Sequence, residues 1–167
     1  MSRTAISSPQ RLTSQHDVSA FECGVPELDD WLRRRALQND ATGASRTFVT
    51  TVGSHVVGYY ALSTGAVSRA AATGRVRRNM PDPIPVMVLA RLAVHREYQQ
   101  RGIGVGLLKD VLLRTLQAAE VAGIRAVLLH AVSDAAKRFY VHHGFVESPV
   151  DPMTLMVTLA DVEKSFK

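Results

Sequence analysis

The sequence is poor in several features that mark particular classes of protein. Its 167 residues contain one cysteine, Cys23, which excludes an intramolecular disulfide and a zinc site built on cysteines. No apolar run approaches the length of a membrane-spanning helix, and the N-terminus has no hydrophobic signal core. We therefore expect a cytoplasmic protein without membrane association, and no residue cluster suggests a metal site.

The remaining composition describes a folded domain with an excess of positive charge. Hydrophobic residues make up 46% and charged residues 21% of the chain, which suits a packed core with a solvated surface. Twenty Lys and Arg against fifteen Asp and Glu give a net charge of +5, and most of the basic residues are arginine. This length and charge predict a single domain over residues 1–167 with a polyanionic partner or ligand.

Hydrophobic periodicity predicts a mixed α/β order of elements. The apolar run of residues 85–94 is typical of a central buried strand, and Gly53-Ser54 is typical of a hairpin turn. We read residues 65–83 as a surface excursion with one helical turn. The other predicted elements are strands at 6–12, 47–52, 56–63, 124–132, 145–147 and 154–159, and helices at 26–39, 107–119 and 135–142.

A glycine-rich segment between the buried strand and the following helix carries the strongest chemical signal. Its glycines let backbone N–H groups approach an anion, and the helix N-terminus adds unsatisfied donors and partial positive charge. Neither a P-loop nor a dinucleotide fingerprint is present. The segment therefore predicts a pyrophosphate cradle, or else a plain strand-to-helix turn. Its residues are Gln99, Gln100, Arg101, Gly102, Ile103, Gly104, Val105 and Gly106.

Two motifs resemble the Gcn5-related N-acetyltransferases. Gln99-x-x-Gly102-x-Gly104 is similar to that family's acyl-CoA-binding motif, and residues 136–145 are similar to its last helix and the turn after it. The sequence departs from many relatives at Gln100 and Arg101, where they carry Gly and Lys. The resemblance covers nearly the whole chain and implies a GNAT fold: a mixed, splayed sheet of six or seven strands flanked by about four helices.

The resemblance also implies acetyl-CoA as the co-substrate and assigns its binding residues. The backbone of Leu92, Ala93 and Val94 would polarise the thioester carbonyl and pair with the pantetheine amides. The pyrophosphate would lie on residues 99–106. Lys137 is a further candidate for the cofactor, and Ser133 either contacts the cofactor or caps the last helix.

Tyr140 is the candidate general acid. A phenol with a pKa near 10 stays protonated at neutral pH and can protonate the departing thiolate; otherwise Tyr140 only packs on the cofactor. No general base is evident, and His95, His142 and His143 stay unassigned. An α-amino group, with a pKa of about 7.7–8.0, needs less help than a lysine at about 10.4.

A narrower resemblance is to the acetyltransferase toxins of bacterial toxin–antitoxin modules. It rests on residues 21–32, 47–49 and 58–63. It implies acetylation of the amino acid on charged tRNA, a ribbon-helix-helix antitoxin, operator DNA bound only through that antitoxin, and a homodimer. The other possibilities are acetylation of a protein N-terminus, a lysine or a small amine, and a non-catalytic module that acts as a co-repressor with its antitoxin.

The arginines are candidates for tRNA contact, because phosphates are drawn to a basic face. We favour Arg77 and Arg78 for tRNA contact, followed by Arg75, Arg91 and Lys137. Each of them could equally lie on an ordinary solvated surface, and part of the basic face could receive an acidic antitoxin tail instead.

Overall fold

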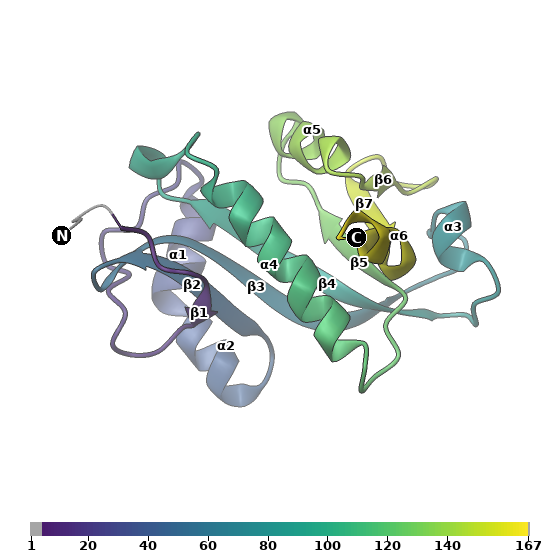
Figure 1. The fold of residues 1–167 in the computed structure, drawn as a ribbon, viewed down its shortest axis with the longest axis horizontal. Coiled ribbons are helices and arrows are strands. Elements are labelled where there is room, and N and C mark those ends of the chain that lie inside the picture. Colours follow the sequence, from purple (N-terminus) through teal and green to yellow (C-terminus); the bar gives the residue numbers. More distant parts are fainter. Residues whose placement is uncertain (1–4, 167) are drawn as a thin grey trace. The chain divides into compact units, whose positions relative to one another are not determined.

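The computed structural model describes residues 5–166, in which it has seven strands and six α-helices (Figure 1). The strands are β1 (Gln10–Arg11), β2 (Arg46–Val52), β3 (His55–Val67), β4 (Ile84–Val94), β5 (Ala126–His130), β6 (Val146–Glu147) and β7 (Thr154–Thr158). The helices are α1 (Pro26–Arg34), α2 (Ala36–Thr42), α3 (Gly74–Arg77), α4 (Ile103–Ala118), α5 (Asp134–His142) and α6 (Leu159–Ser165). A 3-10 turn, η1 (Arg96–Tyr98), follows β4.

The strands form one mixed sheet in the order β1-β2-β3-β4-β5-β7-β6. β4 and β5 are parallel, with Val86 opposite Ala126 and Leu89 opposite Leu129, and α4 lies in the connection that a parallel pair requires. The pairs β1–β2, β2–β3, β5–β7 and β6–β7 are antiparallel. The predicted mixed sheet of six or seven strands is confirmed.

The described residues fall into two compact units, residues 5–63 with 90–111 and residues 64–89 with 112–166. The first unit has a core that includes Phe21, Trp31 and Tyr59. The second has a core that includes Val76, Ala126 and Met156. That residues 1–167 form a single domain stays a prediction.

The predicted first helix is broken in two. Residues 26–39 were expected to form one helix, but Arg35 has φ −125° and ψ −22°, so α1 ends at Arg34 and α2 begins at Ala36. Local periodicity misses this break, because Trp31 and Leu32 of α1 and Ala36 of α2 are all buried and keep helical spacing across it.

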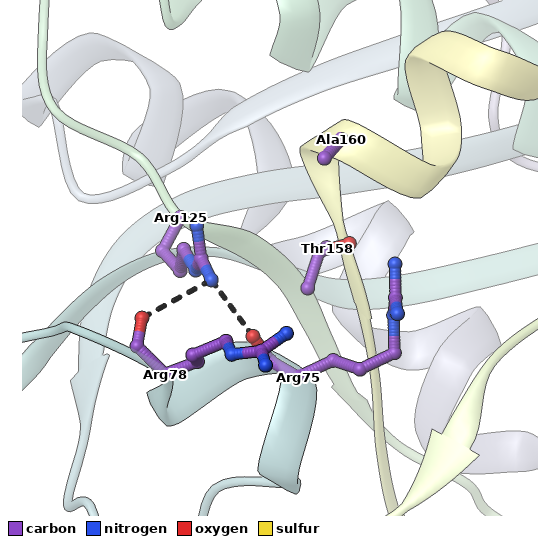
Figure 2. Close-up of a pocket in the computed structure, with 5 residues that line it drawn as sticks. All are labelled: Arg75, Arg78, Arg125, Thr158 and Ala160. Carbon is purple, nitrogen blue, oxygen red and sulfur yellow. Dashed lines mark hydrogen bonds between the residues drawn. The ribbon is translucent and has the colours of Figure 1, made fainter.

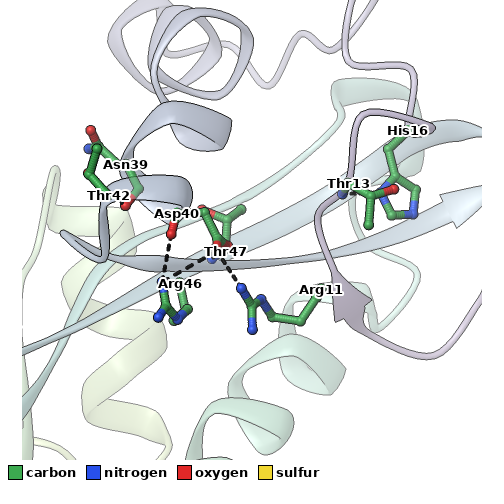
Figure 3. Close-up of polar contacts among 8 residues, drawn as sticks. All are labelled: Arg11, Thr13, His16, Asn39, Asp40, Thr42, Arg46 and Thr47. Carbon is green, nitrogen blue, oxygen red and sulfur yellow. Dashed lines mark hydrogen bonds and ion pairs between the residues drawn. The ribbon is translucent and has the colours of Figure 1, made fainter.

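Asp40 shows what α2 contributes to the first unit (Figure 3). Its buried carboxylate accepts hydrogen bonds from the Thr47 backbone N–H, at 3.2 Å, and from the guanidinium groups of Arg46 and Arg11. Thr47 and Arg46 belong to β2 and Arg11 to β1. One carboxylate therefore connects α2 to the first two strands, which fixes the edge of the sheet.

The helix count also exceeds the expected number of about four. The break at Arg35 adds one helix, and α6 occupies the stretch after β7 that received no assignment. In residues 65–83, β3 continues to Val67 and α3 supplies the expected helical turn. Thr73 caps α3, since its side chain accepts a hydrogen bond from the Val76 N–H. Among residues 5–166 no helix is long and apolar enough to cross a membrane.

Candidate active site

The glycine-rich segment forms a sharp turn into α4, in the first unit. Gln100 has φ 64° and Gly102 has φ 82°, both in the left-handed region, which glycine adopts without a steric penalty. The first intrahelical hydrogen bond runs from Gly106 N–H to the Gly102 carbonyl. The N–H groups of the preceding residues therefore have no carbonyl within the helix, and a helix of 16 residues concentrates partial positive charge at this end.

The surface of this turn is open to a ligand. A Cβ atom added at Gly102 or Gly106 would meet no other atom within 4 Å. Arg101 and Val105 are exposed, and the Arg101 guanidinium lies 5.0 Å from the centre of the Tyr98 ring. The turn thus combines free backbone donors, an arginine and open space, and these features fit the pyrophosphate of an acyl-CoA.

Side-chain contacts behind the turn fix its position. The Gln99 side-chain amide donates to the carbonyl oxygens of Cys23 and Val94, each at 2.9 Å. Below the first turns of α4 lies Gly58 of β3, where an added Cβ would stand 3.1 Å from Leu107 and 3.2 Å from Ile103. Ile103 is therefore a buried anchor of the helix, while the exposed positions of the turn face solvent.

The end of β4 offers a backbone edge. β4 pairs with β5 over Val86–Leu89, and the pairing does not include Leu92, Ala93 and Val94. An extended chain can hydrogen-bond to such an edge as if it were another strand. A pantetheine arm could pair with this edge in the same way, and the assignment of residues 92–94 to the cofactor stays a prediction.

Tyr140 lies on α5, in the second unit, with its ring between two phenylalanines. The ring centres of Phe139 and Phe145 are 5.1 and 5.6 Å away, both in edge-on orientation. The side chain is 8% exposed, and burial raises the pKa of the phenol above its ordinary value of 10. Within residues 5–166 no hydrogen bond holds its hydroxyl, so the proton is available to a ligand.

Two other candidates on α5 have partners within the protein. Ser133 caps the helix, because its hydroxyl accepts a hydrogen bond from the Ala136 N–H at 3.1 Å. Lys137 forms an ion pair with Glu147 at 2.6 Å. The structure thus shows a cap at Ser133, one of its two predicted roles, and gives Lys137 a partner that sequence reasoning missed.

The four candidate arginines for tRNA differ in their surroundings. Arg75, Arg77 and Arg78 are all exposed, and Arg75 forms a two-armed ion pair with Asp161, at 2.8 and 2.6 Å. These three lie on or beside α3 in the second unit. Arg91 belongs to the first unit, and its guanidinium lies 4.3 Å from the centre of the Trp31 ring.

Figure 2 shows a pocket of the second unit that brings two of these arginines together with Arg125. The Arg125 guanidinium donates to the backbone carbonyls of Arg75 and Arg78. Sequence reasoning did not single out Arg125. The only signal was a charged residue at the start of the predicted apolar strand of residues 124–132.

His95 serves the backbone. Its Nδ1 accepts a hydrogen bond from the Glu97 N–H at 3.1 Å and so caps η1, and its Nε2 lies 3.2 Å from the Ala20 carbonyl oxygen. Both ring nitrogens are engaged, so His95 is unsuited to act as a general base. In residues 5–166 no group of three His, Cys, Asp or Glu side chains is arranged to hold a metal ion.

Comparison with known proteins identifies the family. Residues 43–147 match the acetyltransferase (GNAT) domain family. The chain is 53% identical to the tRNA-acetylating toxin of Mycobacterium tuberculosis. The alignment spans 155 residues and covers 93% of each protein. The chain therefore belongs to the GNAT family and is an N-acetyltransferase, as the two sequence motifs indicated.

Solved structures show the same fold. AtaT complexed with acetyl-methionyl-tRNAfMet is 24% identical, with a TM-score of 0.89 over 98% of this chain and 100% of that chain. A mutant AtaT toxin bound to acetyl-CoA and the C-terminus of the antitoxin AtaR is also 24% identical, with a TM-score of 0.84 over 97% and 98% of the two chains. At this identity the likeness establishes the GNAT fold.

Proposed function

We propose that this protein is a toxin that transfers the acetyl group of acetyl-CoA to the α-amino group of aminoacyl-tRNA. The observation that carries the proposal is the 53% identity with a tRNA-acetylating toxin over 93% of both chains. An acetylated α-amino group cannot act as the nucleophile in peptide-bond formation. The reaction would therefore stop translation.

The residues around the turn into α4 are suited to hold acetyl-CoA. Its pyrophosphate would accept hydrogen bonds from the N–H groups of residues 102–106 and would lie near Arg101. Gln100 adopts the left-handed conformation of the turn, and the Gln99 side chain stabilises the turn from behind. The pantetheine amides would pair with β4 at residues 92–94, and a backbone N–H there would polarise the thioester carbonyl.

The transfer forms one bond and breaks another. The neutral α-amino nitrogen attacks the thioester carbon, and the carbon–sulfur bond breaks when the tetrahedral intermediate collapses. Tyr140 gives its proton to the departing thiolate, which leaves as the CoA thiol, and the proton that the amine nitrogen loses returns to the Tyr140 phenolate through solvent. No dedicated base is required, because an α-amino group with a pKa of about 7.7–8.0 is partly neutral at physiological pH.

The proposed partners follow from the same assignment. A ribbon-helix-helix antitoxin would neutralise the toxin, and the pair would act as a repressor by binding operator DNA through the antitoxin. We further propose that the protein acts in the cytoplasm as a homodimer. Lys137 stays a candidate contact for the cofactor, and Arg91 stays a candidate contact for the tRNA.

Acceptor competition tests the proposal. Labelled acetyl-CoA is offered with charged tRNA, uncharged tRNA, a bulk protein fraction and small amines in parallel. We expect label on charged tRNA alone. Label on protein or small amines would agree with an acetyltransferase activity but contradict the proposed toxin function. Transfer to none of these acceptors would favour a non-catalytic module.

A further inference from the structure

The pocket of Figure 2 lies in the second unit, between α3, the start of β5 and α6. Arg75, Arg78, Arg125, Thr158 and Ala160 line it, and its volume is about 80 Å³. A water molecule occupies about 30 Å³ in the liquid, and pockets for drug-sized ligands measure about 300–1,000 Å³. This pocket therefore has room for one small group rather than for a whole nucleoside.

The pocket is built rigidly, because guanidinium groups hold the backbone around it. Arg125 donates through Nε to the Val76 carbonyl at 3.0 Å, and through Nη2 to the carbonyls of Arg75 at 2.8 Å and Arg78 at 3.3 Å. Arg69 donates to the carbonyls of Arg77 and Met80, both at 2.6 Å. Two arginine side chains thus satisfy five carbonyls of residues 75–80 and fix the conformation of this segment.

The charges around the pocket do not balance. Three guanidinium groups line it, and one carboxylate, Asp161, pairs with Arg75. Within residues 5–166, neither Arg78 nor Arg125 has a carboxylate partner. Nη1 of Arg125 makes none of the carbonyl bonds described above, and the planar fork of an arginine matches the oxygens of a phosphate.

We propose that this pocket binds one backbone phosphate of the acceptor tRNA, with Arg78 and Arg125 as its ligands; the identity of the RNA rests on the proposed function. Arg75 already pairs with Asp161, so we assign it to the wall of the pocket and not to the phosphate. The arginines of this basic segment are therefore expected to contribute unequally to tRNA binding. It also adds Arg125, which lies 47 residues from Arg78 in the sequence.

The test is the salt dependence of tRNA binding. Uncharged tRNA serves as the probe, so that binding is measured without the acetyl transfer. Arg78→Gln removes a cation from the pocket and leaves its backbone carbonyl available to Arg125. Each phosphate contact contributes about 0.7–0.9 to the slope of log K against log salt concentration. We expect Arg78→Gln to lower the slope by about that amount and the affinity by about tenfold.

Matched variants separate a phosphate contact from a general loss of charge. Lys164→Gln removes one positive charge from an exposed position on α6 that does not line the pocket. It should leave the slope nearly unchanged. Arg78→Lys should have the salt-dependence slope of the wild type but only part of its affinity for tRNA. A lysine ammonium keeps the positive charge but lacks the paired N–H donors of the guanidinium. With charged tRNA as substrate, Arg78→Gln should raise KM and change kcat little.

An equal slope for the wild type and Arg78→Gln would overturn the proposal. If Arg78→Gln then also binds a polyglutamate peptide more weakly than the wild type, the pocket is a site for acidic protein instead. Both readouts are independent of acetyl transfer. If the wild type fails to acetylate charged tRNA but its RNA binding depends on Arg78, the proposed function is wrong and the phosphate site is supported.

Discussion

The side-chain amide of Gln99 donates a hydrogen bond to the carbonyl oxygen of Cys23, 76 residues away in the sequence, at 2.9 Å. The same amide donates to Val94 at the end of β4. Two further contacts join these regions, from the Arg96 N–H to the Glu22 carbonyl and from His95 to Ala20. The segment before α1, which has no chemistry of its own, therefore supports the turn that is proposed to hold acetyl-CoA.

Gln99→Met should weaken acetyl-CoA binding. The substitution keeps the length of the side chain and removes both hydrogen bonds, each of which contributes about 0.5–1.5 kcal/mol. We expect a several-fold higher KM for acetyl-CoA, a small change in kcat and a lower melting temperature. Gln117→Met, at an exposed position on α4, is the control. An unchanged KM for acetyl-CoA would show that the turn does not depend on Gln99.

Gly58→Ala should displace the start of α4. The new Cβ would stand 3.1–3.2 Å from Leu107, Ile103 and the Thr50 hydroxyl, which is closer than ordinary contact. Overpacking of this kind costs about 1–3 kcal/mol of folding free energy, and acetyl-CoA affinity should fall with it.

Gly123→Ala is the matched control, because a Cβ there meets nothing within 4 Å. Thermal unfolding and acetyl-CoA titration of both variants check the expectation. Equal melting temperatures and affinities for the two would contradict the close packing of Gly58 under the helix.

Tyr140→Phe should keep acetyl-CoA binding and lose most turnover. General acid catalysis by a positioned side chain contributes about 10²–10⁴-fold, so kcat should fall within that range while the dissociation constant for acetyl-CoA holds. A kcat equal to that of the wild type would reduce Tyr140 to a packing residue.

The pH dependence gives a second test of Tyr140. Burial raises the pKa of the phenol, so the acid form persists to higher pH than in an exposed tyrosine. The rate should rise as the substrate α-amino group loses its proton, around pH 7.7–8.0, and then stay level to about pH 9. A fall in initial rate between pH 8 and 9 would argue against a phenol as the acid.

Cys23 should react slowly with thiol reagents in the folded protein. Burial, and then the contact with Asp29, raise the pKa of its thiol from 9.0 to about 11. At pH 8 the thiolate fraction should be about 100-fold lower than in the unfolded chain.

The same shift has a consequence for stability. Because the folded-state pKa is raised, the thiol's contribution to stability is present below pH 9 and is lost as the pH rises through 11. Reagent labelling at pH 8, with and without denaturant, measures the difference in thiolate fraction between the unfolded and the folded protein. Equal labelling rates in the two states would contradict the burial of this thiol.

The sequence allowed the fold and the glycine-rich turn into α4 to be predicted because both depend on local patterns. A buried strand, glycines and an apolar helix in succession define the turn within about twenty residues, and Gly102 adopts the left-handed conformation that this turn needs. Tyr140 was proposed as the general acid from a motif on one short helix, and that role stays a prediction. In each case the residues that carry the signal are neighbours in the chain.

The missed features depend on contacts between distant segments. Arg125 meets the carbonyls of α3 about fifty residues away, and no periodicity marks a guanidinium that binds backbone. The helix break at Arg35 accompanies the contact of Asp40 with β2, which belongs to tertiary structure. The pairing of Lys137 with Glu147 becomes visible only once α5 and β6 are placed, and the assignment of Lys137 to the cofactor stays a prediction.

The central claim is that the acetyl group reaches the α-amino nitrogen of aminoacyl-tRNA, and the most direct test is to locate it there. The protein is incubated with acetyl-CoA and a pool of charged tRNAs, the RNA is digested, and the aminoacyl-adenosine products are analysed by mass spectrometry. We predict N-acetyl-aminoacyl-adenosine with the wild type, almost none with Tyr140→Phe, and none when the α-amino group is formylated beforehand. Acetylation that persists on formylated aminoacyl-tRNA, or unmodified aminoacyl-adenosine after incubation with active enzyme, would contradict the account.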